Sequence, residues 1–234
     1  MNEQTYVGGE LELFAEAHHW KNYWIAKVRA YGRSDVLEVG AGIGSNTVLL
    51  RNDLAHHWVC LEPDAKLAEA LRAKLEGDPA FLNTEVCAGT LASLEGTDQF
   101  DTILYIDVLE HILDDKGELE SAAQHLRPKG NLIVLSPAHA WLFSPFDRAI
   151  GHHRRYTVSG LRGLTPPGLR LERAFYLDSV GLLASAANGL LLRQSMPKPG
   201  QLSFWDNVMV PCSRILDPLT GYTLGKSVIC IWTR

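Results

Sequence analysis

The chain has 234 residues, of which 46% are hydrophobic and 21% are charged, and its formal net charge is −5. These values are ordinary for one globular domain with a large buried core. The negative charge argues against general binding to a nucleic-acid backbone, which requires a concentrated basic surface.

The N-terminal part of the chain predicts one or two helices, because residues 10–31 carry apolar side chains at helical spacing. Residues 1–16 hold acids where a secretory signal would hold basic and apolar residues. The most apolar segment, 180–192, is too short to span a bilayer. We therefore expect a cytoplasmic protein with no membrane span. Candidates for a lid in this first segment are His18, His19 and Trp20, joined by Tyr6 and Tyr23.

A glycine-rich turn follows the first predicted strand, 35–39, with glycines at positions Gly40, Gly42 and Gly44. Glycines there let the backbone turn sharply and approach a ligand closely, since no Cβ intervenes. A second apolar run ends in Glu62, where a carboxylate is placed to accept hydrogen bonds from the two hydroxyls of a ribose. Together the two features predict a nucleoside-bearing cofactor at the edge of a parallel sheet.

Strand and helix patterns alternate along the rest of the chain, which predicts a mostly parallel sheet covered on both faces. A long connection, 178–226, precedes the last strand and contains apolar, helix-like runs. We expect it to cover the site, to make a homodimer contact, or only to pack on the sheet. Strands are predicted near 35–39, 57–61, 82–86, 101–106, 131–136, 169–177 and 227–232, and helices near 44–54, 64–76 and 111–126.

Three motifs together resemble those of the class I S-adenosylmethionine (SAM)-dependent methyltransferases. They are the G-x-G-x-G turn after Glu38, the segment 100–112 reading FDTILYIDVLEHI, and the L-x-P-x-G turn at 126–130. The resemblance implies a three-layer, Rossmann-like fold with a seven-stranded, mostly parallel sheet and an antiparallel last strand. It also implies one domain over 1–234, comprising an N-terminal helical lid (1–33), a core sheet (34–177 and 227–234) and a helical insertion (178–226).

The same resemblance implies SAM as the cofactor. An acid before the glycines suits a cationic ligand better than a diphosphate, because like charges repel. Where the family often has an acid that receives the adenine amino group, this chain has Thr90, whose hydroxyl accepts more weakly. The cofactor residues carried over are Glu38, Gly40, Gly42, Gly44, Glu62, Pro63, Thr90, Leu91, Asp107, Leu109 and His111.

The segment after the fifth strand, which includes GHHRRY at 151–156, is the candidate acceptor site. It resembles an H-x-R-R-Y segment of some natural-product methyltransferases. A neutral histidine can remove an acceptor's proton near neutral pH, and an arginine can hold an oxyanion in a two-pronged contact. A surface cluster of ion pairs is the alternative. The residues concerned are His152, His153, Arg154 and Tyr156 as catalytic candidates, with Arg155 and His139 beside them.

The sequence contains no C-x-x-C pair and no H-x-x-x-H pair, so we expect buried reduced thiols and no metal site. The favoured function is methyl transfer from SAM to a small organic acceptor, at oxygen. Transfer to carbon or nitrogen of a natural product uses the same groups. An NAD(P)-dependent oxidoreductase and a non-catalytic SAM-binding protein are the alternatives from other classes.

Overall fold

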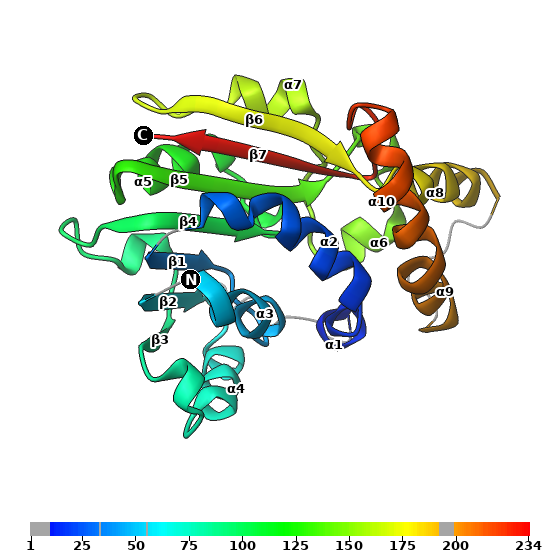
Figure 1. Ribbon diagram of the computed structural model, residues 1–234. Helices are drawn as coiled ribbons and strands as arrows, with labels where there is room; N and C mark the ends of the chain where they lie inside the picture. Colours follow the sequence, from blue (N-terminus) through cyan, green and yellow to red (C-terminus); the bar gives the residue numbers. More distant parts are fainter. Residues whose placement is uncertain (1–9, 33, 55, 192–198) are drawn as a thin grey trace.

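One sheet of seven strands, ordered β3-β2-β1-β4-β5-β7-β6, forms the centre of the computed structural model (Figure 1). The structure describes residues 10–32, 34–54, 56–191 and 199–234. β7 is antiparallel to both of its neighbours, whereas β1 to β5 pair in parallel. The predicted fold class is therefore confirmed. The strands are β1 (Asp35–Val39), β2 (His57–Glu62), β3 (Thr84–Ala88), β4 (Phe100–Ile106), β5 (Leu126–Pro137), β6 (Arg170–Leu177) and β7 (Ser227–Thr233).

Helices cover both faces of this sheet, so the central strands are apolar on both sides. Alternate residues of β1 show this: Val36 packs toward α2, α3 and α4, and Leu37 packs toward α5 and α7. The helices are α1 (Glu10–Ala15), α2 (His18–Val28), α3 (Ser45–Leu54), α4 (Ala65–Leu75), α5 (Asp115–Gln124), α6 (Pro145–Ala149), α7 (Val158–Gly163), α8 (Ser179–Leu191), α9 (Pro199–Phe204) and α10 (Val210–Leu219).

Two predicted boundaries were displaced by local capping. β3 begins two residues later than expected, because Asp78 caps a 3₁₀ turn, η2 (Pro79–Phe81), by accepting the N–H of Ala80 at 2.9 Å. The helix expected from residue 111 begins only at 115, because the Asp114 side chain accepts the N–H of Gly117. The residues before it form a separate 3₁₀ turn, η4 (Leu109–His111), which carries two of the acidic and basic side chains discussed below.

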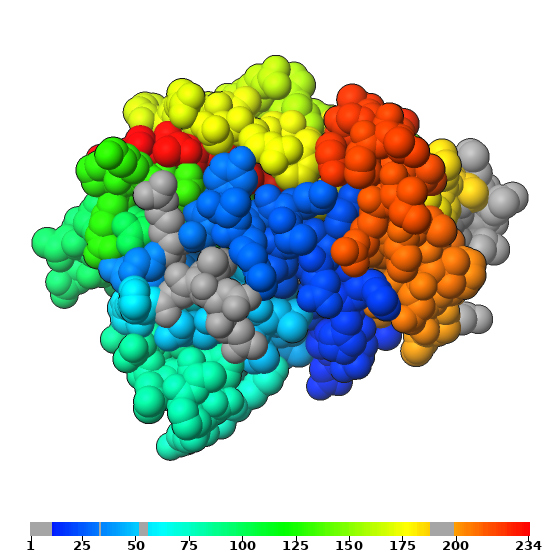
Figure 2. All heavy atoms as spheres, in the orientation of Figure 1, coloured from blue at the N-terminus to red at the C-terminus, as the bar shows by residue number. Residues whose placement is uncertain are grey.

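The connection between β6 and β7 is helical, as expected, and lies beyond the carboxyl ends of the parallel strands (Figure 1). It consists of α8, α9, a π-helical segment η6 (Trp205–Met209) and α10. Asp206 ties this connection to α2, since its carboxylate accepts the N–H groups of His19 at 3.1 Å and Trp20 at 2.8 Å. In the space-filling view, the N-terminal helices meet α9 and α10 on this face (Figure 2).

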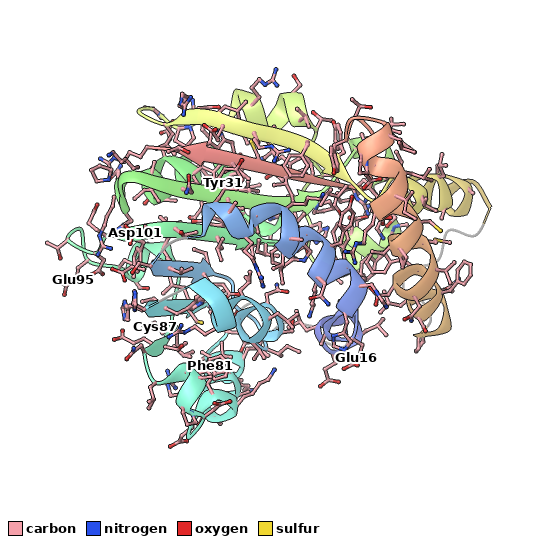
Figure 3. The ribbon with its side chains drawn as sticks, viewed as in Figure 1. Glu16, Tyr31, Phe81, Cys87, Glu95 and Asp101 are labelled. Carbon is pink, nitrogen blue, oxygen red and sulfur yellow. The ribbon has the colours of Figure 1, made fainter. Side chains whose placement is uncertain are left out.

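The opposite end of the sheet is closed by an ion cluster and contributes nothing to the cavity described below. Arg127 pairs there with Asp35 and, at 3.1 Å, with Asp101. Figure 3 labels Asp101 and the nearby Glu95 at this end, far from α8 to α10. Of the helices that the structure describes, none combines the length and the apolar character needed to cross a membrane.

Candidate active site

A cavity of about 1680 Å³ lies at the carboxyl ends of the parallel strands. Sites for one small ligand usually measure roughly 300–1,000 Å³, so this one has room for two molecules side by side. Its wall consists of the glycine turn after β1, the ends of β2 and β4, parts of α1 and α2, most of segment 141–152, and parts of α8 and α9. Ligands of open α/β sheets bind at this edge.

The three glycines after β1 all have positive φ, but for different structural reasons. A Cβ on Gly40 would lie 2.5 Å from Val108, and one on Gly44 would lie 2.2 Å from Leu71. Those two positions require glycine for close packing. A Cβ on Gly42 would have its nearest neighbours at 3.6 Å, and this residue lines the cavity. Gly40 and Gly42 both line the cavity, and Gly42 is the one with room for an added Cβ.

Glu62 joins the glycine turn to the next strand. Its Oε2 accepts the N–H of Gly42 at 2.8 Å, and its Oε1 accepts the N–H of Asp64 at 3.0 Å. Burial raises the pKa of Glu62, and these two hydrogen bonds oppose the rise. Each carboxylate oxygen accepts more than one bond, so both retain capacity on the cavity side. The binding of a ribose by Glu62 stays a prediction.

Glu38 lies behind the glycine turn rather than in the cavity wall. Only 2% of the residue is exposed, and its Oε2 accepts hydrogen bonds from Thr47 at 2.7 Å and Trp58 at 3.0 Å. Burial raises the pKa of Glu38 to about 7, against the effect of these two bonds. The structure thus places Glu38 as an internal brace between β1, β2 and α3, one layer away from a bound ligand.

Asp107 follows β4 directly and lines the cavity. Its φ is 55°, a left-handed conformation that aspartate tolerates better than most residues, and its N–H is held by the carbonyl of Leu135 at 2.8 Å. Surrounding protein raises the pKa of Asp107 to about 6, while His152 and Lys226 oppose the rise. An acidic group is therefore presented to the cavity beside Gly40 and Gly42.

The remaining cofactor candidates divide into two groups. Pro63 and His111 line the cavity. Leu91 and Leu109 are fully buried in the core on the other face of the sheet, and Thr90 is exposed outside the cavity wall, with its carbonyl accepting a hydrogen bond from Ser93. These three side chains are not brought to the cavity, so their assignment to the cofactor stays a prediction.

His152 and Asp147 form a close pair in the acceptor half of the cavity. The Nδ1 atom of His152 lies 2.9 Å from Oδ1 of Asp147, and both residues line the cavity. Burial alone would raise the pKa of Asp147, but bonds from His152 and Arg155 and the charge of Arg155 hold it well below its usual range. An ionised carboxylate only accepts, so Nδ1 of His152 donates to it, and in the neutral ring the lone pair then lies on Nε2.

Arg155 fixes the orientation of this pair. Its Nε and Nη2 atoms donate to the two oxygens of Asp147 at 2.8 and 2.9 Å, a two-pronged contact. Ser144 contributes its N–H at 2.8 Å, which also forms the capping box at the start of α6. The Asp147 carboxylate, with 0% exposure, is thereby fully bonded. Of the two adjacent arginines in the sequence, only Arg155 lines the cavity.

The other three acceptor candidates lie outside the cavity wall. His153 is exposed, and its N–H donates to the Glu110 carbonyl at 2.8 Å. Arg154 pairs with Asp115 at 2.8 Å, and the Tyr156 hydroxyl donates to the same carboxylate at 2.8 Å. This network packs the 152–156 segment beside β5. Both arginines therefore form ion pairs, Arg155 with Asp147 as the alternative expected and Arg154 with Asp115, whereas His152 lines the cavity.

Two lysines in the cavity wall, the buried Lys21 and the partly buried Lys226, were not identified from the sequence. Lys21 in α2 donates to the carbonyl of Ala15 at 3.1 Å, and burial, with the charge of Lys74, lowers its pKa to about 8. Lys226 precedes β7 and lies 3.7 Å from the Trp205 ring centroid. Burial also lowers the pKa of Lys226. In the sequence, Lys21 lies within the apolar-periodic segment 10–31. That pattern predicts a helix but does not indicate that a lysine in it faces a cavity.

The N-terminal helices form part of the cavity wall, but of the predicted lid residues that the structure describes only Trp20 lines it, and a lid stays a prediction. Trp20 and Trp24 are buried and line the cavity. His18 and His19 are exposed at the start of α2, outside the cavity wall. The Tyr23 hydroxyl bonds to Asp217 at 2.8 Å on the side of α10. Tyr6 lies outside the described residues.

Comparison with known proteins shows that the central part of the chain is similar to methyltransferases. Residues 37–132 match the family model of a methyltransferase domain. A ubiquinone biosynthesis O-methyltransferase from Bradyrhizobium diazoefficiens is 25% identical over 118 residues. That match covers 50% of this chain and 45% of the relative, so the chain matches less than half of the relative's length.

Solved structures share the whole fold at low identity. Coclaurine N-methyltransferase bound to N-methylheliamine and S-adenosylhomocysteine (SAH) superposes with a TM-score of 0.64 and 12% identity, over 100% of this chain and 75% of that one. An S-adenosylmethionine-dependent methyltransferase from Mesorhizobium loti gives 0.62 and 14%, over 91% and 98%. Likeness at this level of identity establishes the architecture.

Proposed function

Because the chain carries a class I, SAM-dependent methyltransferase domain, we propose that it transfers the methyl group of SAM to an oxygen atom of a small organic acceptor. The observation that carries the proposal is the position of His152. Its Nδ1 is fixed by Asp147 at 2.9 Å, in a cavity whose other half is formed by Gly42 and Glu62. One cavity thus presents a nucleoside-binding turn and an oriented histidine.

The glycine half of the cavity fits SAM by charge and shape. Glu62 would accept the ribose hydroxyls, and Gly42 would let the ligand approach the backbone, where a side chain would intrude. Asp107 lies in the wall near the expected sulfonium and would stabilise its positive charge. Bound SAM supplies a methyl group on a positively charged sulfur.

The acceptor half supports a largely apolar substrate. Its wall includes Trp141, Phe143, Phe146 and Leu202. In-line methyl transfer depends mainly on alignment of the nucleophile with the sulfonium. His152 would take the acceptor hydroxyl's proton on Nε2 while Asp147 stabilises the charge that forms on the ring. An acceptor carbon or nitrogen would use the same groups, and the identity of the acceptor decides between them.

Calorimetric titration with SAM, SAH and NAD(P)⁺ tests the cofactor class. We expect SAM and SAH to bind with similar affinity and NAD(P)⁺ to bind far more weakly. Tighter binding of NAD(P)⁺ would favour an oxidoreductase. SAM affinity without turnover on any hydroxyl, carbon or amine acceptor would favour a non-catalytic SAM-binding protein.

We also propose that the helical insertion, residues 178–226, forms a homodimer contact. Leu183, Ile215 and Leu219 are exposed there by 70%, 70% and 78%. A chain-to-chain contact over α8 and α10 would bury them, and light scattering on the purified protein measures the oligomeric state. A monomer at all concentrations would remove this part of the proposal.

A further inference from the structure

Three side chains of metal-binding type converge in the cavity wall. They are Glu110 and His111 of η4 and His152 of the acceptor segment, and their ligand atoms all lie within 4.8 Å of one another. This group could not be predicted from the sequence, because His152 stands far from the other two residues along the chain. The fold brings them together when the segment 152–156 runs beside the end of β5.

Glu110 provides the first reason to expect a ligand there. Its side chain has 0% exposure, and Oε2 accepts a hydrogen bond from Ser136 at 3.0 Å. Its Oε1 has no hydrogen-bond partner among the described residues and lies 3.8 Å from Nε2 of His152. Buried carboxylate oxygens are almost always bonded, so an unpartnered one indicates a missing partner, such as a cation.

His152 is held as a metal-ligating histidine usually is, with one ring nitrogen bonded inside the protein. Nδ1 of His152 is paired with Asp147, which leaves Nε2 as the ring nitrogen on the side of Glu110. His111 packs beside Gly151, since its Nδ1 would lie 3.9 Å from a Cβ placed on that glycine. The two rings meet edge to face, with centroids 4.5 Å apart. Such outer partners fix the tautomer and direct the free nitrogen toward the metal.

We propose that Glu110, His111 and His152 bind a divalent transition-metal ion whose open coordination position faces the acceptor. Two imidazoles and one carboxylate suit zinc and similar ions, whereas magnesium prefers oxygen ligands throughout. Ligands about 2.0–2.1 Å from a tetrahedral zinc lie roughly 3.4 Å apart. To bind the ion, the distances between the three donor atoms would therefore have to shorten by about 1 Å. Small side-chain rotations can supply this change.

This inference rests on the proposed methyl transfer and changes the role of His152 in that reaction. The ion binds the acceptor hydroxyl and lowers its pKa, so that the proton leaves to solvent. The oxygen electron pair then forms the new bond to the methyl carbon, and the carbon–sulfur bond breaks with its pair remaining on sulfur. His152 in this case gives its Nε2 lone pair to the ion, and the ion replaces it as the group that activates the hydroxyl.

The test is metal binding by the tag-free full chain after treatment with a chelator. Titration with Zn²⁺ should show one site per chain, and Mg²⁺ should bind at least 100-fold more weakly. Glu110→Gln and His152→Asn should each weaken Zn²⁺ binding by 100-fold or more, while His153→Asn, at the neighbouring exposed histidine, should bind zinc as the wild type does. A thermal melt confirms that each variant is folded.

Cobalt provides a second readout that needs no variant. Co²⁺ in a site of two nitrogens and one carboxylate should give visible absorption bands of a four- or five-coordinate ion, and Zn²⁺ should displace it. Absence of a stoichiometric site, or equal zinc affinity in Glu110→Gln and the wild type, would overturn the inference. SAM titration of the metal-free chain separates the two proposals: binding of SAM without zinc binding would leave the methyltransferase proposal standing and remove only the metal.

Discussion

The Gly42 N–H donates to the Glu62 carboxylate at 2.8 Å, and this bond joins the two halves of the cofactor motif. Gly42 lies in the turn after β1, and Glu62 ends the neighbouring parallel strand β2. Gly40 and Ala41 reinforce the junction, since both of their N–H groups donate to the Leu61 carbonyl. These hydrogen bonds hold the turn in shape, and we propose that the same carboxylate also binds a ribose.

Replacing Glu62 by glutamine tests this double role. The amide keeps one acceptor oxygen, but its NH₂ group would face the N–H of Gly42 or Asp64, where an acceptor is needed. A hydrogen bond to a charged group contributes about 1.5–3 kcal/mol, so SAM affinity should fall roughly 10- to 100-fold. Calorimetry measures the change, with Glu95→Gln at the far end of the sheet as the control. Unchanged affinity would mean that Glu62 does not hold the cofactor.

Gly42, in the glycine turn, and Gly77, after α4, offer a matched pair of substitutions. Gly42 and Gly77 both have positive φ, and neither has a close neighbour for an added Cβ. Alanine should cost each site a similar stability, about 1 kcal/mol. Only Gly42→Ala places a methyl group in the cavity, so only that variant should lose SAM affinity, by 10-fold or more. Equal SAM affinity in the two variants would contradict the placement of the cofactor beside Gly42.

His152→Ala should slow turnover much more than His153→Ala, because only His152 faces the cavity and is oriented by Asp147. Loss of a general base usually costs about 10²- to 10⁴-fold in rate. Both variants should bind SAM normally, which single-turnover assays and calorimetry can verify separately. If neither variant slows transfer once an acceptor is found, the acceptor site lies elsewhere.

The raised pKa of Glu38 predicts that the stability of the protein depends on pH. Burial raises its folded pKa to about 7 from an ordinary value of 4.5, so the folded state retains a proton that the unfolded state has lost between these values. Stability should therefore fall as pH rises from about 4.5 to about 7. Each pKa unit corresponds to about 1.4 kcal/mol, and the contribution of this group is of the order of 1–3 kcal/mol.

The Glu38→Gln variant isolates that contribution, since its side chain is neutral at every pH and its carbonyl still accepts from Thr47 or Trp58. Urea unfolding at pH 5 and at pH 7.5 should show a smaller loss of stability in the variant than in the wild type. Parallel losses in the two proteins would show that Glu38 has an ordinary pKa.

The fold, and the position of the glycine turn and Glu62 in the cavity wall, could be predicted from the sequence because their signals are local. A buried strand, a glycine turn and an acid at the next strand end stand within thirty residues of one another, between Asp35 and Glu62. β1 was predicted at its observed limits, and β2 was one residue short. Position along a parallel sheet then fixes which strand ends meet.

The acceptor half could not be predicted in the same way, because it depends on contacts between distant or adjacent residues that sequence patterns do not distinguish. Arg154 and Arg155 are neighbours, yet one bonds to Asp115 and the other to Asp147. The approach of His152 to Glu110 joins residues on different loops. Lys226 enters the cavity only because β7 inserts between β5 and β6.

A crystal structure of the protein grown with SAH tests the central claim most directly. We predict density for the nucleoside in the crevice beside residues 40–44, with its ribose hydroxyls on the Glu62 carboxylate and its sulfur toward Asp107. A crevice that is empty at saturating SAH, or ligand density at another place on the molecule, would contradict the account.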